Sequence, residues 1–135
     1  MAAFRERRLA GKYPYLMLDA LYEKVRIDGK VVSQAVVVAY GVNIEGKREL
    51  LGVDVVETES YGSWATFLKG LLDRGLRGTK LVISDAHGGL VKAIAVVMNG
   101  VPWQRCKVHY ADLPIMPTLA WKMLAGLAIN ARRSA

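Results

Sequence analysis

The sequence predicts an α/β protein built on a mixed five-stranded sheet with helices on its faces. Three observations support this fold class. Long β-branched runs follow one another with only short turns between them, the apolar spacing then changes to that of a helix, and short apolar runs alternate with helical segments thereafter. Antiparallel strands followed by strands with crossover helices give the element order βββαβαβ.

The first half of the chain is expected to form an antiparallel meander. Residues 15–27 and 31–42 are two strands joined by the turn Asp28-Gly29, which is a hairpin signal. The dense β-branched composition of residues 31–42 is typical of a central strand. A second short turn then leads to a third strand over residues 49–57.

The second half alternates helices and strands. Ser60 or Ser63 can cap a helix whose apolar side chains recur at helical spacing. Residues 81–84 form a short strand that is almost wholly apolar, as strands buried on both faces are. A second helix over residues 88–98 and a fifth strand over residues 103–109 complete the pattern.

We expect residues 1–110 to form the single folded domain and residues 111–135 to be a divergent tail. The length of 135 residues suits one domain with a real core. The tail is apolar without a clear polar face, and Pro114 and Pro117 interrupt it. It is therefore interpreted as a weakly specified helix over about residues 119–129.

Composition narrows the class of protein. A hydrophobic fraction of 53% and a charged fraction of 23% fit a globular domain. The lone Cys106 excludes an internal disulfide and indicates a reducing compartment. The N-terminal residues do not have the pattern of a secretory signal, and no uncharged run approaches the roughly 20 residues of a membrane helix. We therefore expect a cytoplasmic protein that does not contact a membrane.

The net charge of +7 is unevenly distributed along the chain. It is +3 over residues 1–30, −1 over residues 31–85 and +5 over residues 86–135. Basic ends around a near-neutral middle favour a polyanion such as nucleic acid as a partner. The alternative interpretation is that the charge only keeps the chain soluble.

Two aspartates at apolar strands are the strongest candidates for chemistry. Asp19 lies inside the first predicted strand, and Asp85 directly follows the strand over residues 81–84. A carboxylate at such a place is costly to bury, so it normally meets solvent, a partner or a metal. Two that converge suit a hard divalent cation such as Mg²⁺. For Asp85 the alternative is that it caps the helix beginning near Gly88.

The histidines and the cysteine give weaker signals. Cys106 and His109 have Cys-x-x-His spacing, but a zinc site needs three or four ligands and the chain has one cysteine and two histidines. Cys106 is therefore interpreted as a small core residue. His87, two residues after Asp85, is a candidate for a supporting or phosphate-facing group, with a plain loop histidine as the alternative.

The fifth predicted strand has a basic face. Arg105 and Lys107 alternate with Gln104 and Cys106, so the two basic side chains share one face of the strand. They are candidates for contact with a nucleic-acid backbone. A solvated basic face is the alternative. Trp64 and Trp103 are interpreted as core anchors.

Taken together, four blocks of sequence resemble a known family. They are residues 13–20, 41–43, 81–90 and 103–110. In order and spacing these blocks are similar to the catalytic domain of the Mutator-type transposases of bacterial insertion sequences. The resemblance extends from about residue 8 to residue 110.

The resemblance implies a ribonuclease-H-like fold and an Asp-Asp-Glu catalytic triad. It places the first two catalytic, metal-binding carboxylates at Asp19 and Asp85, and it matches Cys106 and His109 to the family's Cys-x-x-His signature. The implied cofactor is Mg²⁺ or Mn²⁺, in a two-metal site of the intact parent. The implied partner is DNA, at the transposon ends and at the target, with a homo-oligomer as an open option.

One part of the family pattern is missing from the sequence. The family's glutamate lies far downstream, whereas here no glutamate follows Glu59, and Asp112 is the only acidic residue after Asp85. We therefore expect a truncated transposase fragment, with residues 1–110 a partial catalytic domain that is inactive alone in Mg²⁺-dependent strand cleavage and transfer. The alternative is a non-catalytic nucleic-acid-binding or interaction module on the same fold.

Overall fold

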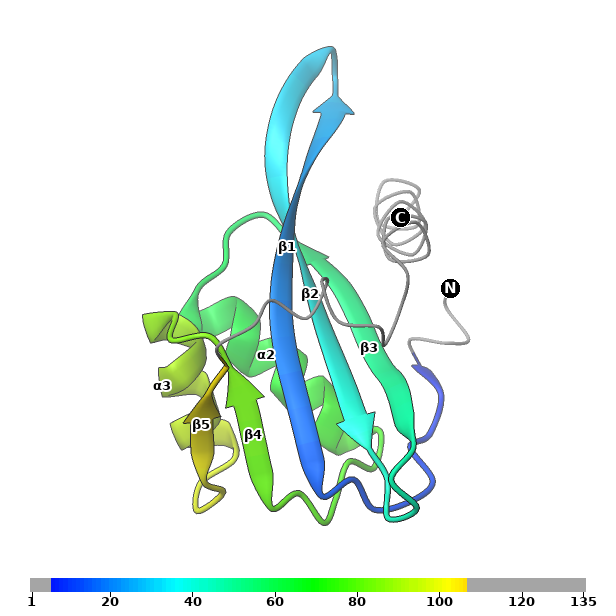
Figure 1. Ribbon diagram of the computed structural model, residues 1–135. Coiled ribbons are helices and arrows are strands. Elements are labelled where there is room, and N and C mark those ends of the chain that lie inside the picture. Colours follow the sequence, from blue (N-terminus) through cyan, green and yellow to red (C-terminus); the bar gives the residue numbers. More distant parts are fainter. Residues whose placement is uncertain (1–5, 107–135) are drawn as a thin grey trace.

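The computed structural model describes residues 6–106, which form a mixed sheet packed against helices (Figure 1). The elements are β1 (Tyr15–Ile27), β2 (Lys30–Val42), β3 (Arg48–Val56), α2 (Tyr61–Asp73), β4 (Leu81–Ser84), α3 (Gly88–Val97) and β5 (Trp103–Arg105). This order is the predicted βββαβαβ. The predicted fifth strand is described only as far as Cys106, so Lys107, His109 and the tail lie outside the described residues.

The sheet has the strand order β3-β2-β1-β4-β5. The pairs β1–β2 and β2–β3 are antiparallel, whereas β1–β4 and β4–β5 are parallel. The predicted mixed sheet is therefore confirmed, and β1 lies at its centre. In the parallel register, Tyr15 is opposite Leu81 and Met17 is opposite Ile83.

Local signals in the sequence explain where the elements begin and end. Asp28 and Gly29 both have positive φ, 52° and 78°, as the tight turn between β1 and β2 requires. Ser60 caps α2 in a capping box, in which its side chain accepts from the Ser63 backbone and the Ser63 side chain accepts from the Ser60 backbone. Both serines proposed from the sequence thus take part in the cap.

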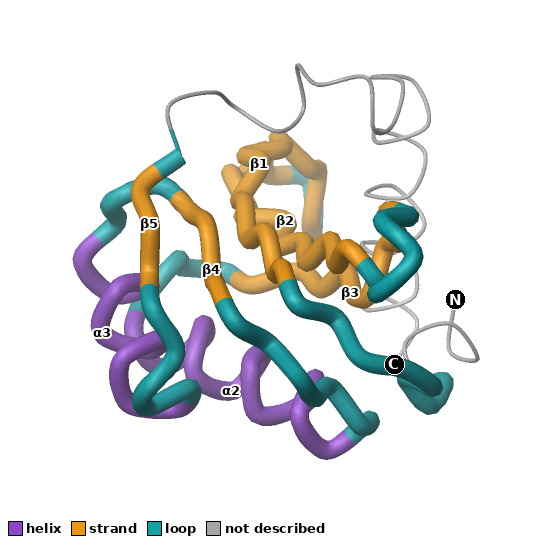
Figure 2. Tube along the Cα trace, turned by 60° about the horizontal axis from the view of Figure 1, so that its bottom comes forward, coloured by secondary structure: helices purple, strands orange, loops and turns teal. Residues whose placement is uncertain are grey.

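Both described helices pack on one face of the sheet (Figure 2). Alternate residues of β1, namely Leu16, Leu18 and Ala20, form a buried cluster with side chains of α2 and α3. The crossovers from β3 to β4 and from β4 to β5 run in the same direction across the sheet. Since parallel crossovers are right-handed, both helices come to lie on the same side. The prediction of helices on the faces of the sheet holds for this one face.

A second apolar cluster lies on the other face of the sheet. It contains Met17 of β1 together with buried valines and Tyr40 of β2 and β3. The strict alternation between the two clusters follows from the period of two in a strand. The β1 and β2 strands are thus apolar on both faces near the middle of the sheet.

The distal halves of β1 and β2 project beyond the rest of the sheet as a two-stranded ribbon (Figure 1). β3 pairs with β2 only over residues 35–42, and β4 pairs with β1 only over residues 15–17. Beyond the pair Tyr22 and Ala35, the two strands pair only with each other. We call residues 22–35 the ribbon.

Candidate metal site and its surroundings

The two predicted aspartates follow the paired segments of the adjacent parallel strands β1 and β4. Met17 lies opposite Ile83, and Asp19 and Asp85 each follow two residues further along the chain. The parallel register, continued past the end of β4, would bring the two positions opposite each other. By alternation, Asp19 lies on the face of Met17, away from the helices. Asp85 lies in the loop after β4, beyond the last paired residue, so alternation does not assign its side chain to a face.

Asp19 is a buried carboxylate in the central strand. Its relative exposure is 5%, and its Oδ1 atom accepts a hydrogen bond of 2.9 Å from the Ala20 backbone. Burial in the first place, and then the negative charge of Asp19, raise the pKa of the Tyr40 hydroxyl. A carboxylate in an apolar strand interior carries a desolvation cost that a positive partner would offset. This environment is consistent with a functional rather than a packing role for Asp19.

Asp85 has a different environment, because it is exposed in the loop after β4. Its Oδ1 atom accepts a hydrogen bond of 3.2 Å from the His87 backbone. The alternative in which Asp85 caps α3 is wrong, since His87 takes the N-cap position and its Nδ1 atom accepts from the Leu90 backbone at 3.3 Å. His87 thus has a definite local role, as the cap of the helix that begins after Asp85.

A third carboxylate, Glu59, lies close to this loop, and the sequence analysis gave it no role. Its side chain is only 6% exposed. Its Oε1 atom accepts a hydrogen bond of 3.0 Å from Trp64 and lies 3.8 Å from Nδ1 of His87. The Tyr22 hydroxyl donates to the other oxygen, Oε2. Glu59 therefore joins β1, the start of α2 and the Asp85 loop. In the sequence, the signal that could have identified Glu59 is its position directly before the capping Ser60.

The pKa of Tyr22 reflects its proximity to Glu59 and Asp85. The hydrogen bond to Glu59, followed by burial and by the charges of Glu59 and Asp85, raises the pKa of Tyr22 to about 12. The phenol therefore stays neutral as a donor at neutral pH. Tyr22 is nevertheless largely exposed, so it lies at the surface beside the candidate site.

Gly89 allows the Asp85 loop to pack closely against the start of α2. A Cβ atom at this position would lie 2.6 Å from the Tyr61 backbone nitrogen and 2.9 Å from the Ser60 carbonyl carbon. Both neighbours are backbone atoms and cannot rotate away. The neighbouring Gly88 has no heavy atom within 4 Å of an equivalent Cβ. The second glycine of the pair is thus required by packing, whereas the first is not.

The residues of β5 are placed on two different faces. Cys106 packs against the second cluster, as expected of a small apolar residue, and its backbone donates to Ser84 at 2.6 Å. Arg105 is exposed and lies opposite Ser84 in the register. By alternation it is on the helix side of the sheet, opposite to Asp19. The predicted pairing of Arg105 with Lys107 is not tested, because Lys107 lies outside the described residues.

The two tryptophans differ. Trp64 is fully buried in the helix-side core, as predicted. Trp103 was also predicted to be a core anchor, and this is wrong: it lies on the edge strand with 36% of its surface exposed, and its Nε1 atom donates to Ser84 Oγ at 2.8 Å. An edge strand is covered by a neighbour on one side only, which explains the exposure of Trp103.

The donor chemistry of the aspartate pair fits a hard divalent cation, although the pair does not form a closed site. Within residues 6–106, no group of three or more His, Cys, Asp and Glu side chains is arranged so that it could hold a metal ion. Two carboxylates suit an ion that keeps several waters, as Mg²⁺ does.

In the same described part of the chain, no helix is both long and apolar enough to cross a membrane.

The five-stranded mixed sheet with its helices has the predicted ribonuclease-H-like fold. The chain also resembles part of a simian T-cell lymphotropic virus intasome, solved in complex with the PP2A regulatory subunit B56 gamma. The TM-score is 0.51 at 11% sequence identity, and the match covers 96% of this chain and 46% of that chain. At this identity the likeness supports the fold alone, and it confirms the predicted fold class.

The sequence comparisons place the chain in a family. The profile described as "Transposase, Mutator family" matches residues 1–123, so the chain belongs to the Mutator family of transposases. The match continues past residue 110, where the motifs predicted that the resemblance would end. The predicted family is thereby confirmed and its extent corrected.

Transposases of bacterial insertion sequences are about half identical to this chain. The transposase of IS406 from Burkholderia multivorans is 50% identical over 109 residues, covering 81% of this chain and 28% of that protein. The transposase of IS1081 from Mycobacterium tuberculosis is 50% identical, covering 81% and 26%. The transposase of IS256 in Tn4001 from Staphylococcus aureus is 48% identical, covering 79% and 28%. The chain thus spans roughly a quarter of the length of these relatives.

Proposed function

We propose that this chain is the part of an insertion-sequence transposase that supplies two metal-binding carboxylates, Asp19 and Asp85, to DNA strand cleavage and transfer. The observation that carries the proposal is the parallel pairing of β1 with β4, in which Met17 lies opposite Ile83 and each aspartate follows two residues later in its chain segment. Membership of the Mutator family supports the same reaction class. The proposed setting is the bacterial cytoplasm, where transposon DNA is accessible.

The two aspartates have complementary surroundings for this role. Asp19 is held in the buried central strand, whereas Asp85 is exposed in a loop anchored by α3 and Glu59. Together they would hold Mg²⁺ or Mn²⁺ through oxygen ligands. A divalent ion at such a place neutralises charge on a phosphoryl group and activates the attacking oxygen. The protein's own contribution is to keep one ligand rigid and leave the other accessible to DNA.

We further propose that these 135 residues alone do not complete the reaction. A two-metal centre needs more negative ligands than two aspartates provide. Glu59 does not make up the difference, since its carboxylate is already bonded to Trp64 and Tyr22. The metal affinity of the chain is therefore expected to be low, in the millimolar range on the order of weak oxygen-ligand sites.

The metal proposal is tested by titrating Mn²⁺ into the chain and measuring the fraction bound by electron paramagnetic resonance. Binding should weaken severalfold in Asp19→Asn and in Asp85→Asn. Asp73→Asn is the matched control, because it removes an exposed carboxylate at the end of α2. Unchanged binding in the first two variants, with circular dichroism showing that they fold, would exclude the pair as a metal site.

A supercoiled-plasmid assay tests the proposed lack of activity. With Mg²⁺ or Mn²⁺ present, the chain should neither nick nor join the plasmid. DNA binding itself should be detectable at low salt and fall steeply as salt rises. Nicking that disappears in Asp19→Asn would contradict the proposal of an incomplete site and would indicate that another group, such as one from a second copy, completes it.

A further inference from the structure

Within the described residues, the ribbon over residues 22–35 has neighbours outside its own hairpin mainly at its base, where Ala35 pairs with Val56 and Tyr22 donates to Glu59. A two-stranded hairpin is marginally stable in water by itself, so its length needs an explanation other than core formation. It is continuous with the strands that hold the buried core, and it extends the sheet outward at the end where Asp19 and Asp85 lie (Figure 1). A ribbon of this width can enter the major groove of DNA or follow its backbone.

The two faces of the ribbon differ in charge. Residues paired across the strands share a face, so Tyr22, Lys24 and Arg26 lie on one face with their partners. These partners are Ala35, Ser33 and Val31. The face therefore contains two positive charges and no negative one. We call Lys24 and Arg26, with Tyr22 at their base, the basic stripe.

The basic stripe is exposed and its charges are available. Lys24 and Arg26 are both exposed, and none of the ion pairs between described residues involves either of them. Their Cα atoms are two residues apart on one strand face, which is about 6.7 Å. Two cations in a row on an exposed β-ribbon are suited to successive phosphates of a nucleic-acid backbone.

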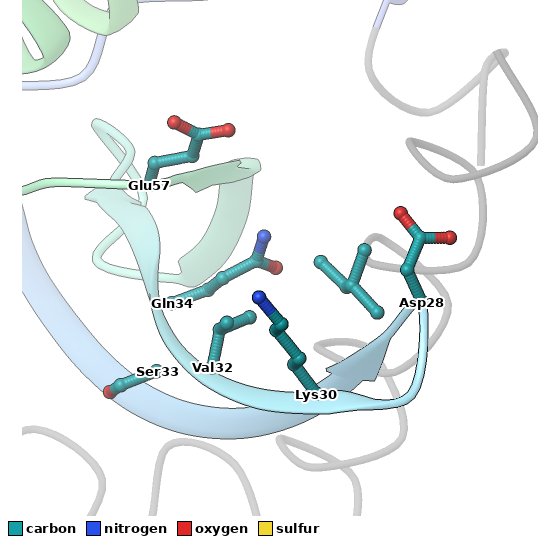
Figure 3. Close-up of a pocket in the computed structure, with 7 residues that line it drawn as sticks. Asp28, Lys30, Val32, Ser33, Gln34 and Glu57 are labelled. Atoms are coloured by element: carbon teal, nitrogen blue, oxygen red, sulfur yellow. The ribbon is translucent and has the colours of Figure 1, made fainter.

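The opposite face of the ribbon is mixed in charge (Figure 3). It forms a hollow of about 480 Å³ in which Lys30 is accompanied by Asp28 and Glu57. Val32 and Gln34 form part of its wall. Because both signs of charge are present, this face offers no net attraction to a polyanion. The difference in charge therefore favours binding of DNA to the face that carries Lys24 and Arg26.

The base of the basic stripe adjoins the candidate metal site. The Tyr22 hydroxyl donates to Glu59, which also lies near His87 in the Asp85 loop. Tyr22 follows Asp19 by three residues on the same strand. By alternation the stripe lies on the helix-side face of β1, opposite to Asp19, so a backbone bound along it would arrive beside Glu59 and the Asp85 loop.

We infer that the basic stripe on the ribbon, formed by Lys24 and Arg26 beside Tyr22, is a contact surface for the phosphate backbone of DNA that runs beside the Asp85 loop. The inference rests on the proposed function and adds to it a surface outside the aspartate pair. The ribbon projects so that its basic face can follow DNA beyond the site of chemistry.

The test is the salt dependence of duplex DNA binding, measured by fluorescence anisotropy between low and moderate salt. The double variant Lys24→Ala with Arg26→Ala should bind more weakly. The slope of log K against log salt should become shallower by about 1.8, which corresponds to two lost phosphate contacts. Both side chains are exposed on a ribbon, so the variant is expected to fold like the wild type.

The matched control removes two positive charges elsewhere. Lys47→Ala with Lys69→Ala changes exposed residues at the β2–β3 turn and on α2, and it should leave the slope unchanged. An equal loss in both double variants, or an unchanged slope in the ribbon variant, would overturn the inference while leaving the proposed function standing. Absence of wild-type binding at low salt would instead overturn DNA binding by this chain altogether.

Discussion

The two halves of the β1–β2 hairpin share the same pairing and differ in almost everything else. In the half next to β3 and β4, the side chains of β1 and β2 are buried on both faces. In the ribbon half, the side chains of residues 30–33 are all exposed and charges alternate with apolar residues. Continuous hydrogen-bond pairing therefore does not by itself make a strand part of the core.

The difference arises from which neighbours each half has. The inner half is flanked by β3 and β4 and covered by α2 and α3, so its apolar residues contribute hydrophobic stabilisation. The ribbon has only its own partner strand. Its residues are thus free to serve binding, at little cost to the stability of the domain. Asp19 lies on the inner side of this division and Tyr22 at its start.

The largest effect is expected from Leu18→Ala in the inner half. Leu18 is 1% exposed in the helix-side cluster, so the free energy of unfolding should fall by about 2–5 kcal/mol. Val31→Ala in the ribbon should change it by no more than about 0.5 kcal/mol, because that side chain is 60% exposed. Urea denaturation followed by circular dichroism measures both. Similar losses in the two variants would refute the proposed contrast between the halves.

An intermediate effect is expected at the loop that follows β4. Gly89→Ala should destabilise the domain by about 1–3 kcal/mol, because the new methyl group would overlap backbone atoms of Ser60 and Tyr61. Gly88→Ala adds the same group where there is open space, so it should be close to neutral. Thermal melts of the two variants, compared with the wild type, provide the measurement. Equal melting temperatures would show that the Asp85 loop is not closely packed.

The smallest effect is expected from Tyr22 and appears only in alkali. Its folded-state pKa of about 12 is above the ordinary value of 10, so the native state binds this proton more tightly than the unfolded state. The stability that it contributes is fully present below pH 10 and is lost as the pH rises from 10 through 12. Tyr22→Phe should therefore lose less stability than the wild type across this window. An identical pH profile would contradict the hydrogen bond to Glu59.

Periodicity in the sequence was sufficient to predict the type and order of the elements. The strand over residues 15–27, the turn at Asp28-Gly29 and the capping serines follow from local signals, and each was found where predicted. Asp19 and Asp85 were recognisable as candidates because a carboxylate at an apolar strand is unusual. Their catalytic role stays a prediction, since nothing in the described structure tests it.

Other features depended on contacts between distant parts of the chain. The parallel pairing of β1 with β4, which precedes Asp19 and Asp85, joins residues far apart in sequence. The contacts of Glu59 with Tyr22, Trp64 and His87 do the same. The prediction that Trp103 is a core anchor was wrong, because the local sequence does not reveal that β5 is an edge strand. The sequence by itself thus determined the elements and the candidate carboxylates, because these follow from local periodicity and residue chemistry. Only the tertiary structure decided which half of β1 and β2 is core and which is ribbon, because that depends on where β3, β4 and the helices end.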